Sequence, residues 1–155
     1  MRKYGLILII AFFMQIFFSN LFSIRGVRPD FLIIFVLYFA VNFGSFKGVL
    51  AGFSIGLIAS IFNSGLIIGL LPLIYSLVGY TGGFLKNQHY KMVPFYFNFS
   101  YFLIIMGSFF IFSYFHYDYL FYNNFKIFLL TWFKTTLYTV CILAILQFIV
   151  PLRRT

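Results

Sequence analysis

The feature that most constrains this chain is a series of apolar runs, each separated from the next by a short polar segment. They cover approximately residues 4–22, 30–43, 48–62, 66–85, 93–115 and 125–150. Because an α-helix rises about 1.5 Å per residue, about 20 apolar residues cross a hydrocarbon core of about 30 Å. The sequence therefore predicts an all-α integral membrane protein, a six-transmembrane-helix bundle in which residues 1–155 form a single membrane domain.

Composition excludes a water-soluble alternative. Charged residues make up 8% of the chain and hydrophobic residues 63%, whereas soluble domains carry about 25% charged residues. So few charges cannot cover a surface that faces water.

The second and third runs read best as two helices. A single helix over residues 31–62 would be roughly 48 Å long, well beyond the hydrocarbon core. The stretch from Asn42 to Lys47 contains Gly44 and is the natural break. Two short helices of roughly 20–24 Å follow.

The basic residues predict membrane topology rather than nucleic-acid binding. Eleven Lys and Arg stand against two acidic residues, and they cluster at the ends of the apolar runs, where anionic lipid headgroups are their expected partners. Six crossings place Lys47, Lys86 and Lys91 in the cytoplasm, together with the basic residues of both termini. We therefore expect a multi-pass membrane protein with both termini cytoplasmic.

A row of small residues occupies every fourth position of the third run: Gly48, Gly52, Gly56 and Ser60. On a helix these residues form a flat face that another backbone can approach closely. Internal helix packing is the favoured interpretation. The alternative is a face for a transmembrane helix of a partner.

Asp30 is the first candidate polar anchor. It precedes the second run, where a carboxylate caps free N–H groups and meets the positive helix end. A cap paired with Arg25 or Arg28 is the favoured interpretation, and an anchor for an extracytoplasmic partner is the alternative.

Lys134 is the second candidate polar anchor, a basic residue inside an apolar run. Thr131, Thr135 and Tyr138 share its helical face, which predicts that this face points into the bundle. Alternatively, the side chain snorkels toward the nearer, outer surface. The sequence leaves both open.

The sequence predicts neither an enzyme nor a metal or cofactor site. Gly52-Phe53-Ser54-Ile55-Gly56 matches a nucleophile elbow, but that motif needs a strand-to-helix turn, and here it lies within an apolar run. Cys141 is the only cysteine, so an internal disulfide and a cysteine metal site are excluded.

Residues 29–86 resemble the rod shape-determining protein MreD family, mainly through the order and spacing of their residues. The matching residues are Pro29 to Phe35, Gly44, Gly48, Gly52-Phe53, Gly56-Leu57, Asn63-Ser64-Gly65, Gly69, Leu73, Tyr75 and Gly79-Tyr80. There are two departures. The family often carries an Asp where this chain has Ser60, and an Asn in the turn after Gly69, where this chain reads Leu70-Leu71-Pro72.

The resemblance implies a non-enzymatic scaffold or regulatory subunit of the bacterial elongation machinery, located in the bacterial cytoplasmic (inner) membrane. Its expected partners are an MreC-like protein, an MreB-like cytoskeleton, a RodA-type glycosyltransferase and a class B penicillin-binding transpeptidase. It also implies helices like those of the substrate-binding subunits of energy-coupling-factor transporters.

A transporter subunit that binds a small, vitamin-like molecule is the rival hypothesis. Short helices interrupted by glycine can line a binding site at the membrane midplane. The polar groups best placed for such a site are Asn98, Tyr101, Thr131 and Lys134.

Overall fold

The computed structural model describes residues 30–62, 69–86, 88 and 93–149, and its regular secondary structure there is helical throughout. The helices are α3 (Phe31–Phe43), α4 (Ser45–Phe62), α5 (Leu70–Gly83), α6 (Pro94–His116), α7 (Asp118–Asn123) and α8 (Phe125–Ile149). The all-α prediction is confirmed for these residues. The run at residues 4–22 lies outside them.

Three of these helices are long and apolar enough to cross a membrane: α4, α6 and α8. The helices α3 and α5 are apolar but shorter, at 13 and 14 residues. α4 begins at Ser45, three residues before its predicted start, and α5 begins four residues after its predicted start. The short helix α7 forms where the sequence suggested only a loop between two runs.

Asp30 and Gly44 set the limits of α3. The Asp30 Oδ1 atom accepts hydrogen bonds from the N–H groups of Leu32, at 3.0 Å, and Ile33, at 3.1 Å. At the other end Gly44 has φ +96°, and its N–H donates to the Ala40 carbonyl at 2.7 Å. Residues with an L side chain rarely adopt this φ. The glycine therefore allows a turn in which Gly44 is the single residue between α3 and α4.

Lys86 stabilises this turn from the end of α5. Its ammonium donates to the Phe43 carbonyl at 3.2 Å, one of the carbonyls that a helix leaves without an intrahelical donor. A cation at this position also meets the negative end of α3. Lys47 lies at the same end of the bundle, with its ammonium 5.7 Å from the Phe43 ring centroid.

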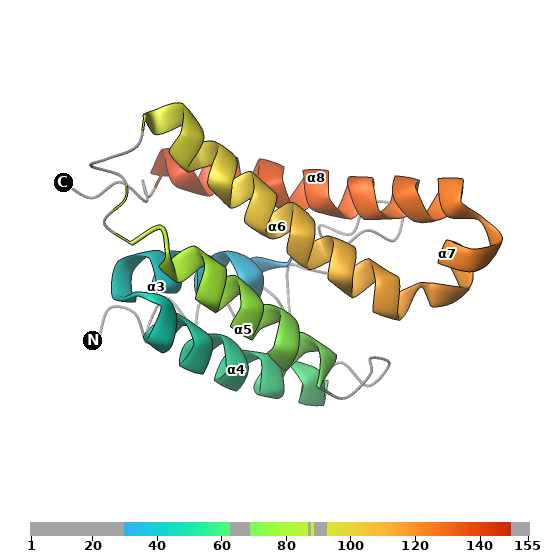
Figure 1. The fold of residues 1–155 in the computed structure, drawn as a ribbon, viewed down its shortest axis with the longest axis horizontal. Helices are drawn as coiled ribbons and strands as arrows, with labels where there is room; N and C mark the ends of the chain where they lie inside the picture. Colours follow the sequence, from blue (N-terminus) through green and yellow to red (C-terminus); the bar gives the residue numbers. More distant parts are fainter. Residues whose placement is uncertain (1–29, 63–68, 87, 89–92, 150–155) are drawn as a thin grey trace.

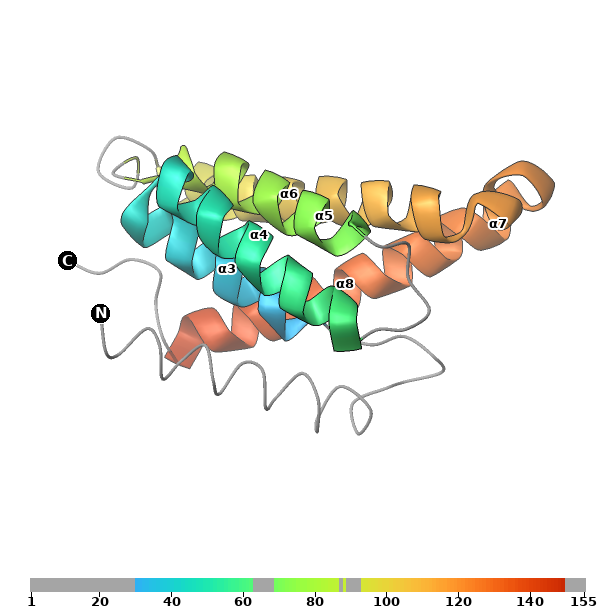
Figure 2. The same cartoon turned by 90° about the horizontal axis from the view of Figure 1, so that it is seen from below.

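The helices form two groups, α3 with α4 and α5, and α6 with α8, which meet where α5 packs against α6 (Figures 1 and 2). On one side α4 and α5 run antiparallel, side by side. On the other, α6 and α8 run antiparallel and are joined through α7. The indole N–H of Trp132 on α8 donates to the Met106 carbonyl on α6 at 3.2 Å, and the rings of Phe110 and Trp132 meet edge to face.

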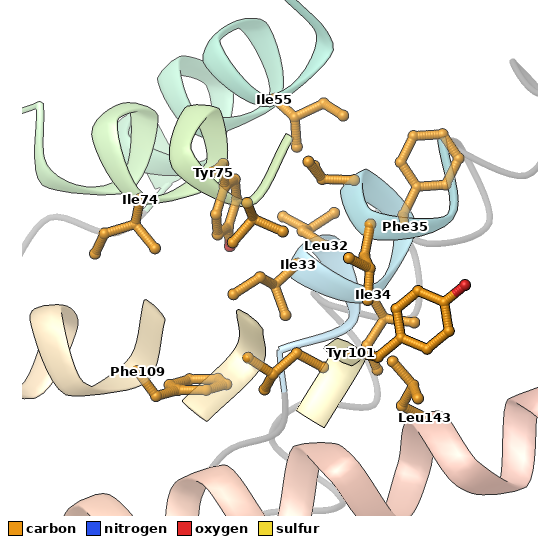
Figure 3. Close-up of a cluster of buried hydrophobic side chains, with 14 of the residues drawn as sticks. Leu32, Ile33, Ile34, Phe35, Ile55, Ile74, Tyr75, Tyr101, Phe109 and Leu143 are labelled. Carbon is orange, nitrogen blue, oxygen red and sulfur yellow. The ribbon is translucent and has the colours of Figure 1, made fainter. Parts of the chain in front are cut away.

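The core gathers around α3 (Figure 3). Eight of the 13 residues of α3 are buried. Ile55 of α4, Ile74 and Tyr75 of α5, Tyr101 and Phe109 of α6, and Leu143 of α8 surround it. A helix that is apolar on all sides is expected to be enclosed by its neighbours, and α3 meets this expectation. Among the described helices α5 is enclosed to a similar extent.

Candidate functional site

The glycine face of α4 lies directly against the backbone of α5. A Cβ atom placed on Gly48 would collide with the Gly79 carbonyl. One on Gly52 would collide with the Tyr75 carbonyl, and one on Gly56 with Pro72. All three glycines are buried. Their missing side chains therefore let the two helix backbones touch over three successive turns.

α5 contributes glycines to the same contact. A Cβ on Gly79 would collide with the Gly48 carbonyl, and one on Gly83 with the Ser45 backbone. The contact thus runs from Gly56 to the turn between α3 and α4. Since α5 already covers the glycine face of α4, that face offers no open surface to a helix of another protein.

Ser60 continues the row in sequence but differs in environment. It is half-buried, and its hydroxyl donates to the Gly56 carbonyl of its own helix at 2.7 Å. Such a bond satisfies the hydroxyl without another helix. The neighbouring Ala59 is the buried residue of this turn.

Asp30 joins the start of α3 to α5. While its Oδ1 atom caps α3, its Oδ2 atom accepts a hydrogen bond of 2.7 Å from the Tyr75 hydroxyl. Tyr75 is 2% exposed, and its own carbonyl lies against Gly52. One residue of α5 therefore contacts both the carboxyl group that caps α3 and the glycine face of α4.

This arrangement favours an internal role for Asp30, because both carboxyl oxygens have partners within the chain. Pro29, Arg25 and Arg28 lie outside the described residues, so the predicted pairing with an arginine stays a prediction. Sequence reasoning placed Asp30 at the helix start but missed Tyr75 as its partner, since 45 residues separate them.

Two other residues of the family-like motif lie at the start of α5 and on its surface. Gly69 precedes the helix with φ +97°, a conformation that favours glycine. Tyr80 is exposed, and its ring meets Phe84 edge to face. Tyr80 therefore belongs to the outer surface, whereas Gly79 beside it is buried against α4.

Of the two interpretations left open for Lys134, a side chain that points into the bundle does not fit the structure. Lys134 is exposed, and Thr131 and Thr135 are only half-buried. The buried polar residues of α8 are instead Thr136 and Thr139. The helical face that carries Thr131, Lys134 and Thr135 therefore spans the boundary between the buried and exposed sides of α8. Lys134 lies on the exposed side of that boundary.

Four hydroxyl groups of α6 and α8 are buried. They belong to Ser108, Ser113, Thr136 and Thr139. Ser108 and Thr136 donate to carbonyls one turn earlier in their own helices, at 2.6 and 2.8 Å. Small hydroxyl residues allow close packing of membrane helices. Their presence within apolar runs is the sequence feature that could have predicted their burial.

The structure does not gather the polar groups that a small-molecule site would need. Asn98 and Lys134 are exposed and Thr131 is half-buried, whereas Tyr101 is 1% exposed. Ser54, the central residue of the elbow-like motif, is exposed in the middle of α4, and its hydroxyl donates to the Leu50 carbonyl at 2.9 Å.

No protein-family model matches the chain, and no curated protein or solved structure matches it at a significant level.

Proposed function

We propose that this chain is a non-enzymatic scaffold or regulatory subunit of the bacterial rod-shape (elongation) complex. In this role it spans the inner membrane six times and supports peptidoglycan synthesis and cell shape by helix–helix docking. Its partners are an MreC-like protein, the MreB-like cytoskeleton, a RodA-type glycosyltransferase and a class B penicillin-binding transpeptidase.

One observation carries the proposal: the residues of the family-like motif converge on the unit formed by α3, α4 and α5. Asp30 and Gly44 set the ends of α3, and Gly48, Gly52 and Gly79 lie in the α4–α5 contact. A pattern whose members fix one three-helix unit is more specific than isolated glycines. It is the pattern expected of a chain whose role is to hold a defined shape for partners.

The distribution of charge supports the proposed orientation. Lys47 and Lys86 both lie at the end of the bundle where α3 turns into α4, while Lys126 lies near α7 at the other end (Figure 1). The basic termini and Lys91 add to the first end if the chain crosses six times. Cytoplasmic ends of membrane proteins carry such an excess of basic residues.

Co-purification from the bacterium's own membranes tests the proposal. The full chain carries an affinity tag and is extracted in mild detergent, with an unrelated six-span protein tagged in the same way as a control. We expect the MreC-like protein to co-purify with the chain, and depletion of the chain to turn rods into spheres. Recovery no greater than with the control, in cells that keep their shape after depletion, would contradict the proposal.

The same preparation tests the rival hypothesis of a vitamin-binding transporter subunit. A ligand that binds the folded state raises the thermal midpoint in proportion to the logarithm of its concentration. The scaffold proposal predicts no such shift with soluble vitamins. A saturable increase with one vitamin would favour the transporter.

A further inference from the structure

Lys134 is an exposed cation in the middle of the apolar part of α8. The apolar window of this helix covers Phe125–Ile145, so Lys134 lies nine residues after its start and eleven before its end. At about 1.5 Å per residue these separations are about 14 and 17 Å. The methylene stem of a lysine reaches roughly one helical turn, about 5 Å. Its ammonium therefore stays inside the hydrocarbon layer rather than at a headgroup.

The chain has no side-chain carboxylate to neutralise this ammonium. Asp30 and Asp118 are the only acidic residues. Asp30 caps α3 and accepts from Tyr75. Asp118 lies at the start of α7, where it accepts from the Tyr119 N–H. Intramembrane charges pair with other polar groups, so a carboxylate partner for Lys134 has to come from another molecule.

The exposed residues of α8 around Lys134 have the sequence spacing of a surface that pairs with another helix. Six exposed residues on this side of α8 recur at alternating intervals of three and four. They are Ile127, Leu130, Lys134, Leu137, Cys141 and Ala144, which together we call the Lys134 seam. This seven-residue repeat is the pattern by which two helices interlock side chains at a shallow angle, and one polar residue within it fixes the register.

We propose that the Lys134 seam docks one transmembrane helix of a partner protein that carries a carboxylate at the level of the membrane midplane. A second copy of this chain does not fit. Symmetric pairing of two seams would place the two Lys134 ammonium groups opposite each other. Docking through this seam deepens the helix–helix docking of the proposed function, but it does not depend on which pathway the partner serves.

Disulfide cross-linking to a synthetic helix tests the proposal directly. The probe is a Leu/Ala transmembrane peptide with Glu at its centre and one Cys seven residues away. That Cys faces Cys141, the chain's single, exposed cysteine, when Glu faces Lys134. Peptides with Cys before or after Glu cover both directions of pairing. The full chain and peptide are combined in phosphatidylcholine vesicles, prepared with and without anionic phosphatidylglycerol, and oxidised, and the initial rate of cross-linking is measured.

Matched substitutions in both molecules decide the outcome. We expect the Glu peptide to cross-link roughly five- to thirty-fold faster than its Glu→Leu counterpart, the range that model peptides give for one polar contact between membrane helices. Lys134→Leu should abolish the difference and Lys134→Arg should retain it. Because Lys134 is exposed, these variants should fold, and the peptide comparison needs no variant.

Two results would overturn the proposal. One is equal cross-linking of the Glu and Leu peptides to the unmodified chain. The other is a rate that depends on anionic lipid but not on the carboxylate of the peptide, which would mean that Lys134 binds a headgroup. Neither result touches co-purification with the MreC-like protein, so failure of the Lys134 seam is distinguishable from failure of the proposed function.

Discussion

At the scale of single residues, the contact between Asp30 and Tyr75 explains how the start of α3 is held against α5. A carboxyl group that caps a helix is a local feature, and the sequence predicts it from the position of Asp30 before an apolar run. The hydrogen bond that Asp30 accepts from the Tyr75 hydroxyl joins residues far apart in the sequence, so no periodic sequence pattern predicts it. The sequence also left the environment of Lys134 open, because polar neighbours on one face of a helix do not reveal which of them are buried.

Removing the Tyr75 hydroxyl should cost measurable stability. Tyr75→Phe leaves one buried carboxyl oxygen without its donor, and we expect the free energy of unfolding to fall by about 1–2 kcal/mol. Asp30→Ala removes the helix cap as well and should cost about 2–4 kcal/mol. Unfolding of the purified chain in mixed detergent micelles measures both changes.

Tyr80→Phe is the matched control, since Tyr80 lies on the same helix and is exposed. It should change stability by less than about 0.5 kcal/mol. Equal losses in Tyr75→Phe and Tyr80→Phe would show that the Asp30 contact does not stabilise the fold.

At the scale of elements, the α4–α5 contact is the tightest contact between the described helices. The sequence predicts the face from glycines repeated every fourth residue. It does not identify the helix that covers the face, because the repeat describes one surface and not its partner. The contributions of Gly79 and Gly83 emerge only when α5 is placed antiparallel to α4.

A methyl group at the centre of this contact should force the two helices apart. Gly52→Ala places Cβ against the Tyr75 carbonyl, a backbone group that cannot rotate away. We expect a loss of about 1–3 kcal/mol in the free energy of unfolding. Gly107→Ala is the matched control within a helix, because a Cβ there has no atom within 4 Å. A Gly52→Ala variant as stable as Gly107→Ala would contradict the close contact.

At the scale of the whole molecule, the described helices form an apolar bundle with an apolar outer surface. The outward side chains of α4 include Leu50, Phe53 and Ile61, all about half exposed or more. Such a surface suits lipid, because a soluble monomer rarely exposes apolar patches larger than a few hundred Å². Composition alone predicts this class. Which residues face outward follows only from the way α3 is enclosed.

The most direct test of this account is the side of the membrane on which each end of the bundle lies. In a Cys141→Ser background, single cysteines replace Phe46, beside Lys47, and Tyr122, on α7, which are 78% and 76% exposed. A membrane-impermeant maleimide is applied to spheroplasts before and after permeabilisation. A third variant, Phe53→Cys, reports the lipid-facing side of α4. We predict labelling of Tyr122→Cys from outside, of Phe46→Cys only after permeabilisation, and of Phe53→Cys in neither case. Equal labelling of all three in intact spheroplasts would contradict the account.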